Sequence, residues 1–142
     1  MNILGKLSKD QKSAIKYFAD NLISKQMQRN LTIRIIFTKY QSMLGETEIM
    51  DYNGKGEPRE FALIIQKDID RDEALKTIAH ELVHVKQYLY KELNEQMTLW
   101  RGRKVSEEQF EDYYDRPWEK EAHELGDKLF EDYHDYIKQY NH

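Results

Sequence analysis

The chain has 142 residues, of which 39% are hydrophobic and 34% are charged, and its formal net charge is −4. This length and apolar content predict a single folded domain, while the acidic balance disfavours direct nucleic-acid binding, which usually needs a basic face. The chain has no cysteine, so disulfides and thiolate metal sites are excluded and any metal ligand must be His, Glu or Asp.

The sequence predicts no membrane segment. No stretch approaches the roughly 20 apolar residues that a membrane span requires, and residues 1–6 lack the apolar run of a signal peptide. We therefore expect a cytoplasmic protein without a membrane partner. The composition indicates no particular oligomeric state.

The first predicted elements are a helix and two strands. Ser8 followed by Gln11 forms a capping box, and the apolar spacing after it predicts a helix over about residues 9–28. Residues 31–37 alternate and are rich in β-branched side chains, which predicts a strand. Residues 46–52 predict a second, weaker strand.

A turn and a third strand follow. Asn53-Gly54 is a strong turn signal, and the nearly continuous apolar run of residues 60–66 predicts a strand buried on both faces. We expect the second and third strands to form a hairpin. With the first strand they predict a three-stranded, mainly antiparallel sheet.

The remaining elements are helical. Asp70 followed by Glu73 begins a predicted helix in residues 71–93, which contain no Gly or Pro. Residues 94–116 predict a solvated segment anchored by one aromatic residue, Trp100, with a short helix near residues 107–114. Pro117 is well placed as the first residue of a final helix that runs to about residue 139. This order of elements predicts the α+β class.

The first of these helices carries His80-Glu81-Leu82-Val83-His84, an H-E-x-x-H pattern. Two histidines four residues apart project from the same side of a helix, so their imidazoles can converge on one tetrahedral Zn²⁺. Glu81 lies on the adjoining side and can reach a metal-bound water without being a ligand. The position of the pattern within a helix, after an extended apolar segment, favours metal binding over chance.

A zinc hydrolase site usually has three protein ligands and one position for water, so a third ligand must come from elsewhere. Tyr88 and Tyr90 stand where two extensions of the pattern would place a third histidine. The C-terminal helix remains, and it offers Glu119, Glu121 and His123. The spacing of these residues does not choose among them.

The combination of motifs resembles compact, phage-encoded, zincin-like metallopeptidases. Those proteins carry H-E-L-x-H-x-x-Q, W-x-G and P-W-E-x-E-A, which correspond here to residues 80–87, 100–102 and 117–122. The resemblance covers roughly the C-terminal half of the chain. The last motif is also similar to that of ImmA/IrrE-type peptidases, in which the Glu before Ala binds the metal. SprT-like peptidases are a more distant comparison, and only His123 could match their third histidine.

The resemblance implies a minimal zincin-like fold with a gluzincin-like set of zinc ligands, His80, His84 and Glu121. It implies for Glu119 an outer position, from which its carboxylate would fix the free N–H of a ligand histidine. It also implies that strand 60–66 lies at the cleft and pairs with extended substrate backbone.

We therefore expect a zinc metallopeptidase that acts on a peptide or protein substrate. The ion would lower the pKa of a bound water towards neutrality, and Glu81, as general base, would take its proton and pass it to the leaving nitrogen. Tyr113 and Tyr114 are candidates for stabilising the oxyanion, although packing is the preferred role for each. The alternative, from another class, is a non-catalytic, zinc-stabilised module that binds a peptide or protein.

Overall fold

The chain folds into helices and strands of the α+β class, and the computed structural model describes residues 1–39 and 42–140, with only the backbone described at residue 107. The elements in chain order are β1 (Asn2–Leu4), α1 (Lys9–Leu22), α2 (Lys25–Gln28), β2 (Thr32–Thr38), β3 (Gly45–Tyr52), β4 (Pro58–Gln66), α3 (Arg71–Leu89), β5 (Leu99–Trp100), β6 (Arg103–Lys104), the 3₁₀ turns η1 (Glu107–Gln109) and η2 (Tyr113–Asp115), and α4 (Pro117–Tyr140).

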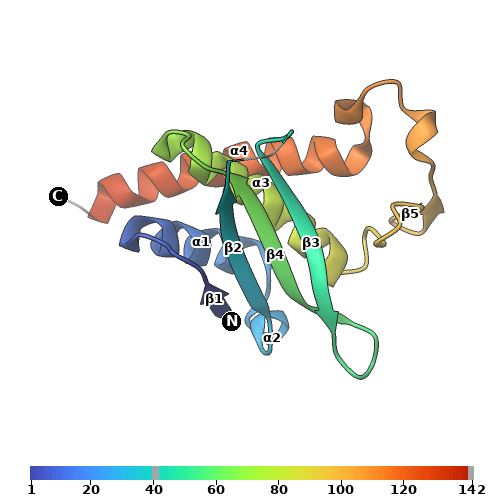
Figure 1. Ribbon diagram of the computed structural model, residues 1–142, viewed down its shortest axis with the longest axis horizontal. Helices are drawn as coiled ribbons and strands as arrows, with labels where there is room; N and C mark the ends of the chain where they lie inside the picture. Colours follow the sequence, from blue (N-terminus) through green and yellow to red (C-terminus); the bar gives the residue numbers. More distant parts are fainter. Residues whose placement is uncertain (40–41, 141–142) are drawn as a thin grey trace.

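In the described residues, four strands form the main sheet, in the order β1-β2-β4-β3 (Figure 1). β1 pairs with β2 and β2 pairs with β4 in parallel, whereas β3 pairs with β4 antiparallel. The predicted hairpin is confirmed, but the prediction of three mainly antiparallel strands is wrong. β1 has three residues, which is too short for a periodic signal, and the parallel pairing of β2 with β4 bypasses the intervening β3.

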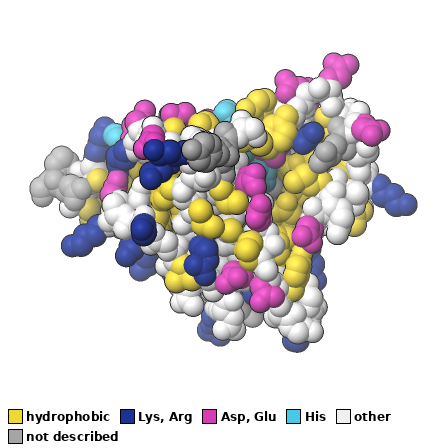
Figure 2. All heavy atoms as spheres, in the orientation of Figure 1, with side chains coloured by type: hydrophobic (Ala, Val, Ile, Leu, Met, Phe, Trp, Pro, Cys, Tyr) yellow, Lys and Arg dark blue, Asp and Glu magenta, His cyan; other side chains and the backbone are white. Residues whose placement is uncertain are grey.

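Helices α1 and α3 cover one face of the sheet and bury the hydrophobic core against it (Figure 1). Each large side chain removed from water there contributes roughly 1.5–3 kcal/mol to stability. The fully buried residues of this layer include Ile15, Phe18, Ile33, Phe61, Leu63, Ile65, Leu75 and Ile78. On the face of the molecule seen in Figure 2, hydrophobic side chains lie among Asp and Glu side chains.

The helix predicted over residues 9–28 is interrupted. α1 ends at Leu22, and Ser24 starts a new helix because its hydroxyl accepts a hydrogen bond from the Met27 N–H. The side chain of Gln28 then donates to the carbonyl of Ile23 at 2.8 Å. A serine that caps a second helix thus ends the first one, although the apolar spacing continues through it.

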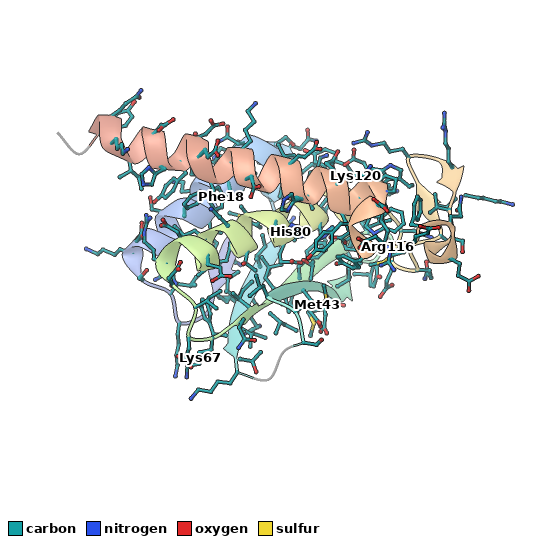
Figure 3. All side chains as sticks on the ribbon, turned by 90° about the horizontal axis from the view of Figure 1, so that it is seen from above. Phe18, Met43, Lys67, His80, Arg116 and Lys120 are labelled. Carbon is teal, nitrogen blue, oxygen red and sulfur yellow. The ribbon has the colours of Figure 1, made fainter. Side chains whose placement is uncertain are left out.

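The two long helices begin where the sequence predicts. Asp70 caps α3 by accepting a hydrogen bond from the Glu73 N–H at 2.8 Å, and Pro117 is the first residue of α4. α4 extends along α3, with His80 beneath it (Figure 3). A Cβ at Gly126 would lie 3.1 Å from the backbone of His80, so a residue without a side chain permits this close approach.

The segment between these helices is anchored by Trp100, which is buried against Trp118 with the ring centroids 6.2 Å apart. Its neighbours Arg101 and Gly102 are exposed, as the sequence predicts for a solvated segment. The short helix expected near residues 107–114 is instead two separate 3₁₀ turns. Among the helices in the described part of the chain, none is long and apolar enough for a membrane crossing.

Candidate metal centre

Two histidines of α3 and one glutamate of α4 converge at a single point. Glu119 Oε1 lies 3.1 Å from His80 Nε2 and 3.1 Å from His84 Nε2. One ligand atom from each of the three residues lies within 4.8 Å of the other two. Ligands around a tetrahedral zinc are about 3.3 Å apart when each metal bond is about 2.0–2.1 Å long. The donor atoms therefore have the spacing and the chemistry to hold a divalent metal ion.

Helical geometry accounts for this convergence. The four-residue spacing places the rings of His80 and His84 one turn apart, with their centroids separated by 5.0 Å. Glu119 occupies the first turn of α4, next to Trp118, which is fully buried and packs its ring edge-to-face against Phe110. Because Trp118 fixes the rotation of α4 at its start, the adjacent carboxylate is directed towards α3.

Hydrogen bonds between imidazole and carboxylate join the three side chains. Burial alone would lower the pKa of His84, but the hydrogen bond and the charge of Glu119 outweigh it and raise the pKa above its usual range. Burial alone would raise the pKa of Glu119, but the hydrogen bonds from His80 and His84 hold that pKa below its usual range. A divalent cation can take the place of the protons in such a cluster.

Glu121, expected from the resemblance to be the third ligand, lies elsewhere. Its Oε1 accepts hydrogen bonds from Lys86 Nζ at 2.9 Å and Gln87 Nε2 at 3.1 Å, and its Oε2 pairs with Arg101. Burial alone would raise the pKa of Glu121, but the hydrogen bonds from Lys86 and Gln87 hold it below its usual range. Glu121 therefore lies outside the two-histidine cluster, and Glu119 occupies the position expected of the third ligand.

The three candidates on α4 are thus separated by the structure. Glu119 joins the histidines instead of taking the outer position that the resemblance implies. His123 lies one turn further along α4, is largely exposed, and has its Nε2 3.6 Å from Asp127 Oδ2. The sequence leaves this choice open because it does not tell which side of α4 faces α3.

Glu81 is buried beside the cluster without belonging to it. The hydroxyl of Thr47, on β3, donates to this glutamate, with Oγ1 2.8 Å from Glu81 Oε1 and 3.1 Å from its carbonyl oxygen. Glu81 Oε2 lies 3.9 Å from His80 Nε2. A Cβ at Gly45 would come within 2.6 Å of Thr77 Cγ2, which shows how closely β3 packs on α3 here.

Three further residues at the site are Gln87, Thr47 and Tyr113. Gln87 Oε1 lies 2.8 Å from His84 Nδ1. The sequence can predict this contact, because residues three apart on a helix are neighbours on its surface. Thr47 is 34 residues from Glu81, and no local pattern links the two. Burial, with the charge and hydrogen bond of the Glu119 carboxylate, raises the pKa of Tyr113, a candidate for stabilising the oxyanion.

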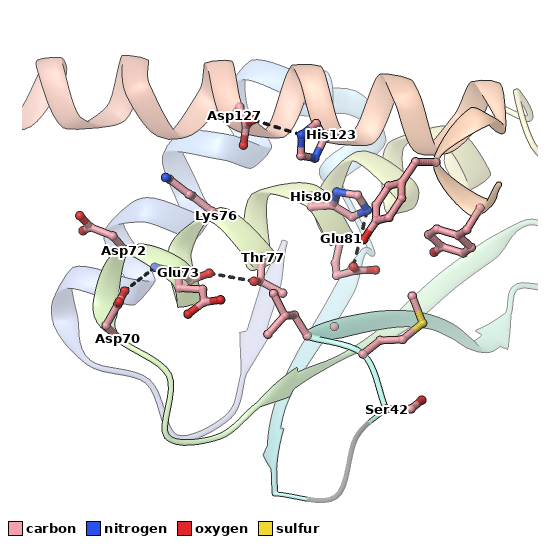
Figure 4. Close-up of a pocket in the computed structure, with 15 residues that line it drawn as sticks. Ser42, Asp70, Asp72, Glu73, Lys76, Thr77, His80, Glu81, His123 and Asp127 are labelled. Carbon is pink, nitrogen blue, oxygen red and sulfur yellow. Dashed lines mark hydrogen bonds and ion pairs between the residues drawn. The ribbon is translucent and has the colours of Figure 1, made fainter.

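A cleft of about 740 Å³ opens beside His80 and Glu81, between α3, α4 and the start of β3 (Figure 4). His80 and Glu81 lie at one part of the cleft, and Asp70 and Asp72 lie towards its other end (Figure 4). Its other lining residues include Met43, Leu44, Gly45, Thr77, Tyr113 and His123. The volume is in the range of sites that hold small molecules or parts of a peptide.

The strand that borders the cleft is β3, and not the strand of residues 60–66 that the resemblance implies. β4, which contains residues 60–66, is hydrogen-bonded to β2 on one side and β3 on the other, so it cannot pair with a substrate. β3 is the edge strand, and its first residue, Gly45, lines the cleft.

Comparisons of the chain with protein-family models, with curated proteins and with solved structures found no match.

Proposed function

We propose that this protein is a zinc-dependent metallopeptidase with a minimal zincin-like fold, in which His80, His84 and Glu119 hold the ion. The observation that carries the proposal is the position of Glu119 Oε1, 3.1 Å from both Nε2 atoms, beside a buried glutamate outside this set. Structural zinc sites usually have four protein ligands, whereas three ligands leave a position for water, as hydrolysis requires.

When bound, a zinc ion supplies Lewis-acid activation of a water molecule and of the substrate carbonyl. Glu81 accepts a proton from water as the water oxygen bonds to the peptide carbonyl carbon. Glu81 then delivers that proton to the nitrogen as the C–N bond breaks. Thr47 supports this role because it holds Oε1 of the carboxylate and leaves Oε2 on the side of the cluster.

Tyr113 is suited to stabilise the oxyanion that forms during attack. Its hydroxyl lies close to Glu119, and burial with the charge of Glu119 raises its pKa further above neutrality, so it is a hydrogen-bond donor at pH 7. Tyr114 is 61% exposed and contacts the ring of Tyr113 edge-to-face. These features favour a role for Tyr114 in holding the Tyr113 ring in place.

The edge strand β3 is suited to bind an extended peptide. An edge strand has backbone N–H and C=O groups free for pairing along one side, and a peptide added there gains main-chain hydrogen bonds. The role that the resemblance implies for residues 60–66 therefore passes to β3 in this proposal.

Cleavage of peptide bonds tests the proposal. The zinc-loaded protein is incubated with a diverse peptide library, and cleaved bonds are identified by mass spectrometry. We expect hydrolysis by the wild type and a roughly 10²–10⁴-fold lower rate for Glu81→Gln, because the amide cannot accept a proton. The zinc content of Glu81→Gln should equal that of the wild type, since Glu81 is not a ligand.

Two results would overturn this assignment. Equal cleavage by wild type and Glu81→Gln would remove Glu81 as the general base. Binding of library peptides by the zinc-loaded wild type without any cleavage would assign the cleft to the alternative class, a non-catalytic, zinc-stabilised peptide-binding module.

A further inference from the structure

Gln87 is fully buried between α3 and α4, and its hydrogen bonds determine which way the amide faces. Nε2 lies 3.0 Å from the carbonyl oxygen of Trp118 and 3.1 Å from Glu121 Oε1. A backbone carbonyl and an ionised carboxylate can only accept hydrogen bonds, so the NH₂ group must face them. The opposite amide orientation would place three oxygens against one another.

The amide oxygen therefore faces His84. Gln87 Oε1 lies 2.8 Å from His84 Nδ1, and an oxygen acceptor at this distance requires the hydrogen to be on Nδ1. The lone pair of the neutral ring is then on Nε2, the atom 3.1 Å from Glu119 Oε1. Metal-ligating histidines use this arrangement, in which one ring nitrogen binds the ion and the other donates to a fixed acceptor.

We propose that Gln87 is a positioning residue that fixes the tautomer of His84 for metal binding, and that Glu121 supports it by holding the Gln87 amide in place. The inference rests on the proposed zinc site. It assigns to the glutamate before Ala122 a role in orienting a ligand, in place of the ligand role that the resemblance implies.

The charges around Glu121 hold its carboxylate in place. Lys86 Nζ lies 2.9 Å from Glu121 Oε1 and 2.7 Å from Glu92 Oε1. Arg101 pairs with Glu121 and lies 3.4 Å from Glu92 Oε2. Two cations and two carboxylates thus form a compact network, which keeps Glu121 beside Gln87.

The same contacts join residues from the three segments that carry the sequence motifs. Gln87 ends the first motif, Arg101 is the middle residue of the second, and Glu121 precedes alanine in the third. In the fold these residues form a chain of contacts, in which Arg101 pairs with Glu121, Glu121 accepts a hydrogen bond from Gln87, and Gln87 contacts His84. Their shared function is therefore to hold Gln87 in the orientation that contacts Nδ1 of His84.

Zinc affinity, measured on the full chain by competition with a chromophoric chelator, tests the inference. Gln87→Leu keeps a side chain of similar size but removes the acceptor, and we expect zinc to bind roughly 10–100-fold more weakly. Glu121→Gln should weaken binding less, because Trp118 still orients the amide. The matched control is Glu131→Gln, which removes the same charge from an exposed position further along α4, and it should bind zinc as the wild type does.

Histidine ¹⁵N spectra of the zinc-loaded wild type give a readout that does not depend on any variant. We expect His84 to bind zinc through Nε2 and to keep a slowly exchanging hydrogen on Nδ1. In Gln87→Leu that hydrogen should exchange rapidly, while the signals of His80 stay unchanged.

The possible negative results distinguish failure of this inference from failure of the proposed function. A wild type that binds zinc through Nδ1 of His84, or a Gln87→Leu protein that binds zinc as tightly as the wild type, would overturn this inference alone. A wild type that binds no zinc would overturn the proposed function and this inference together.

Discussion

Glu119 and Glu121 are two residues apart on α4 and lie in different surroundings. Residues two apart on a helix are separated by about 200° around its axis, and the two carboxylates contact different parts of α3. Glu119 faces the imidazoles of α3, and Glu121 faces Lys86 and Arg101. The sequence predicts His80, Glu81 and His84 because these residues lie close together on one helix. The third ligand depends on how α4 packs on α3, and residue spacing gives no information about that packing.

Thr47 provides a prediction at this scale. Thr47→Val keeps the shape of the side chain but removes the hydroxyl that donates to Glu81. A hydrogen bond to a charged group is worth about 1.5–3 kcal/mol, so kcat for peptide hydrolysis should fall roughly 10–100-fold. Zinc content should not change, because neither residue is a ligand.

The control for this variant is Thr32→Val. Thr32 pairs with Glu60 on the neighbouring β4 and lies outside the cleft and the cluster. Its kcat should match that of the wild type. A Thr47→Val protein with the wild-type kcat would show that Glu81 needs no support from β3.

At the scale of elements, the long helices and the β3–β4 hairpin follow from their sequence, because caps and periodicity act within one segment. Asp70 and Pro117 mark helix starts that the structure confirms. The break at Ser24 and the short strand β1 could not be predicted in this way. Ser24 competes with a continuing apolar pattern, and β1 is recognisable only through its pairing with β2.

The contact between α3 and α4 gives a prediction about stability. In Gly126→Ala the new Cβ would lie 3.1 Å from the backbone of His80, which cannot move aside as a side chain would. Overpacking costs about 1–3 kcal/mol, against about 1 kcal/mol gained by replacing a helical glycine. We therefore expect a lower free energy of unfolding in urea and weaker zinc binding, because the ligands come from both helices.

Gly54→Ala is the matched control for this substitution. A Cβ at Gly54 meets nothing within 4 Å, so its free energy of unfolding should stay within about 0.5 kcal/mol of the wild type. A Gly126→Ala protein more stable than the wild type would contradict the account of a close helix approach.

The starts of α1 and α3 are joined by an ion pair that predicts a pH dependence. Arg71 Nε lies 2.6 Å from Asp10 Oδ2, and this hydrogen bond lowers the pKa of Asp10. A carboxyl whose pKa is lower in the folded state adds stability above its unfolded pKa of about 3.9, and loses it as the pH falls further. Both side chains are more than a third exposed, so solvent limits the gain to about 0.5–1 kcal/mol.

We therefore expect Arg71→Gln to be less stable than the wild type by about this amount at pH 7. The difference should shrink as the pH falls below 4 and disappear once Asp10 is protonated in both proteins. Urea unfolding across this pH range measures it, and Asp10→Asn should show the same trend. A difference that stays constant down to pH 2 would mean that the pair is not its source.

For the whole molecule, the candidate metal centre connects elements that are distant in sequence. The two histidines come from α3, while Glu119 comes from α4, 35 residues beyond His84. An ion held by all three would join these helices at the cleft, so metal binding and the packing of α4 on α3 would stabilise each other. The sequence predicts the composition of such a centre, and the arrangement of the helices decides which carboxylate completes it.

Anomalous diffraction at the zinc absorption edge, from crystals of the zinc-loaded protein, tests this central claim most directly. We predict one zinc ion bonded to His80 Nε2, His84 Nε2 and a carboxylate oxygen of Glu119, at about 2.0–2.2 Å each, with Glu121 still paired to Lys86. A map with no anomalous peak at the two histidines, or a peak ligated by Glu121 or His123, would contradict the account.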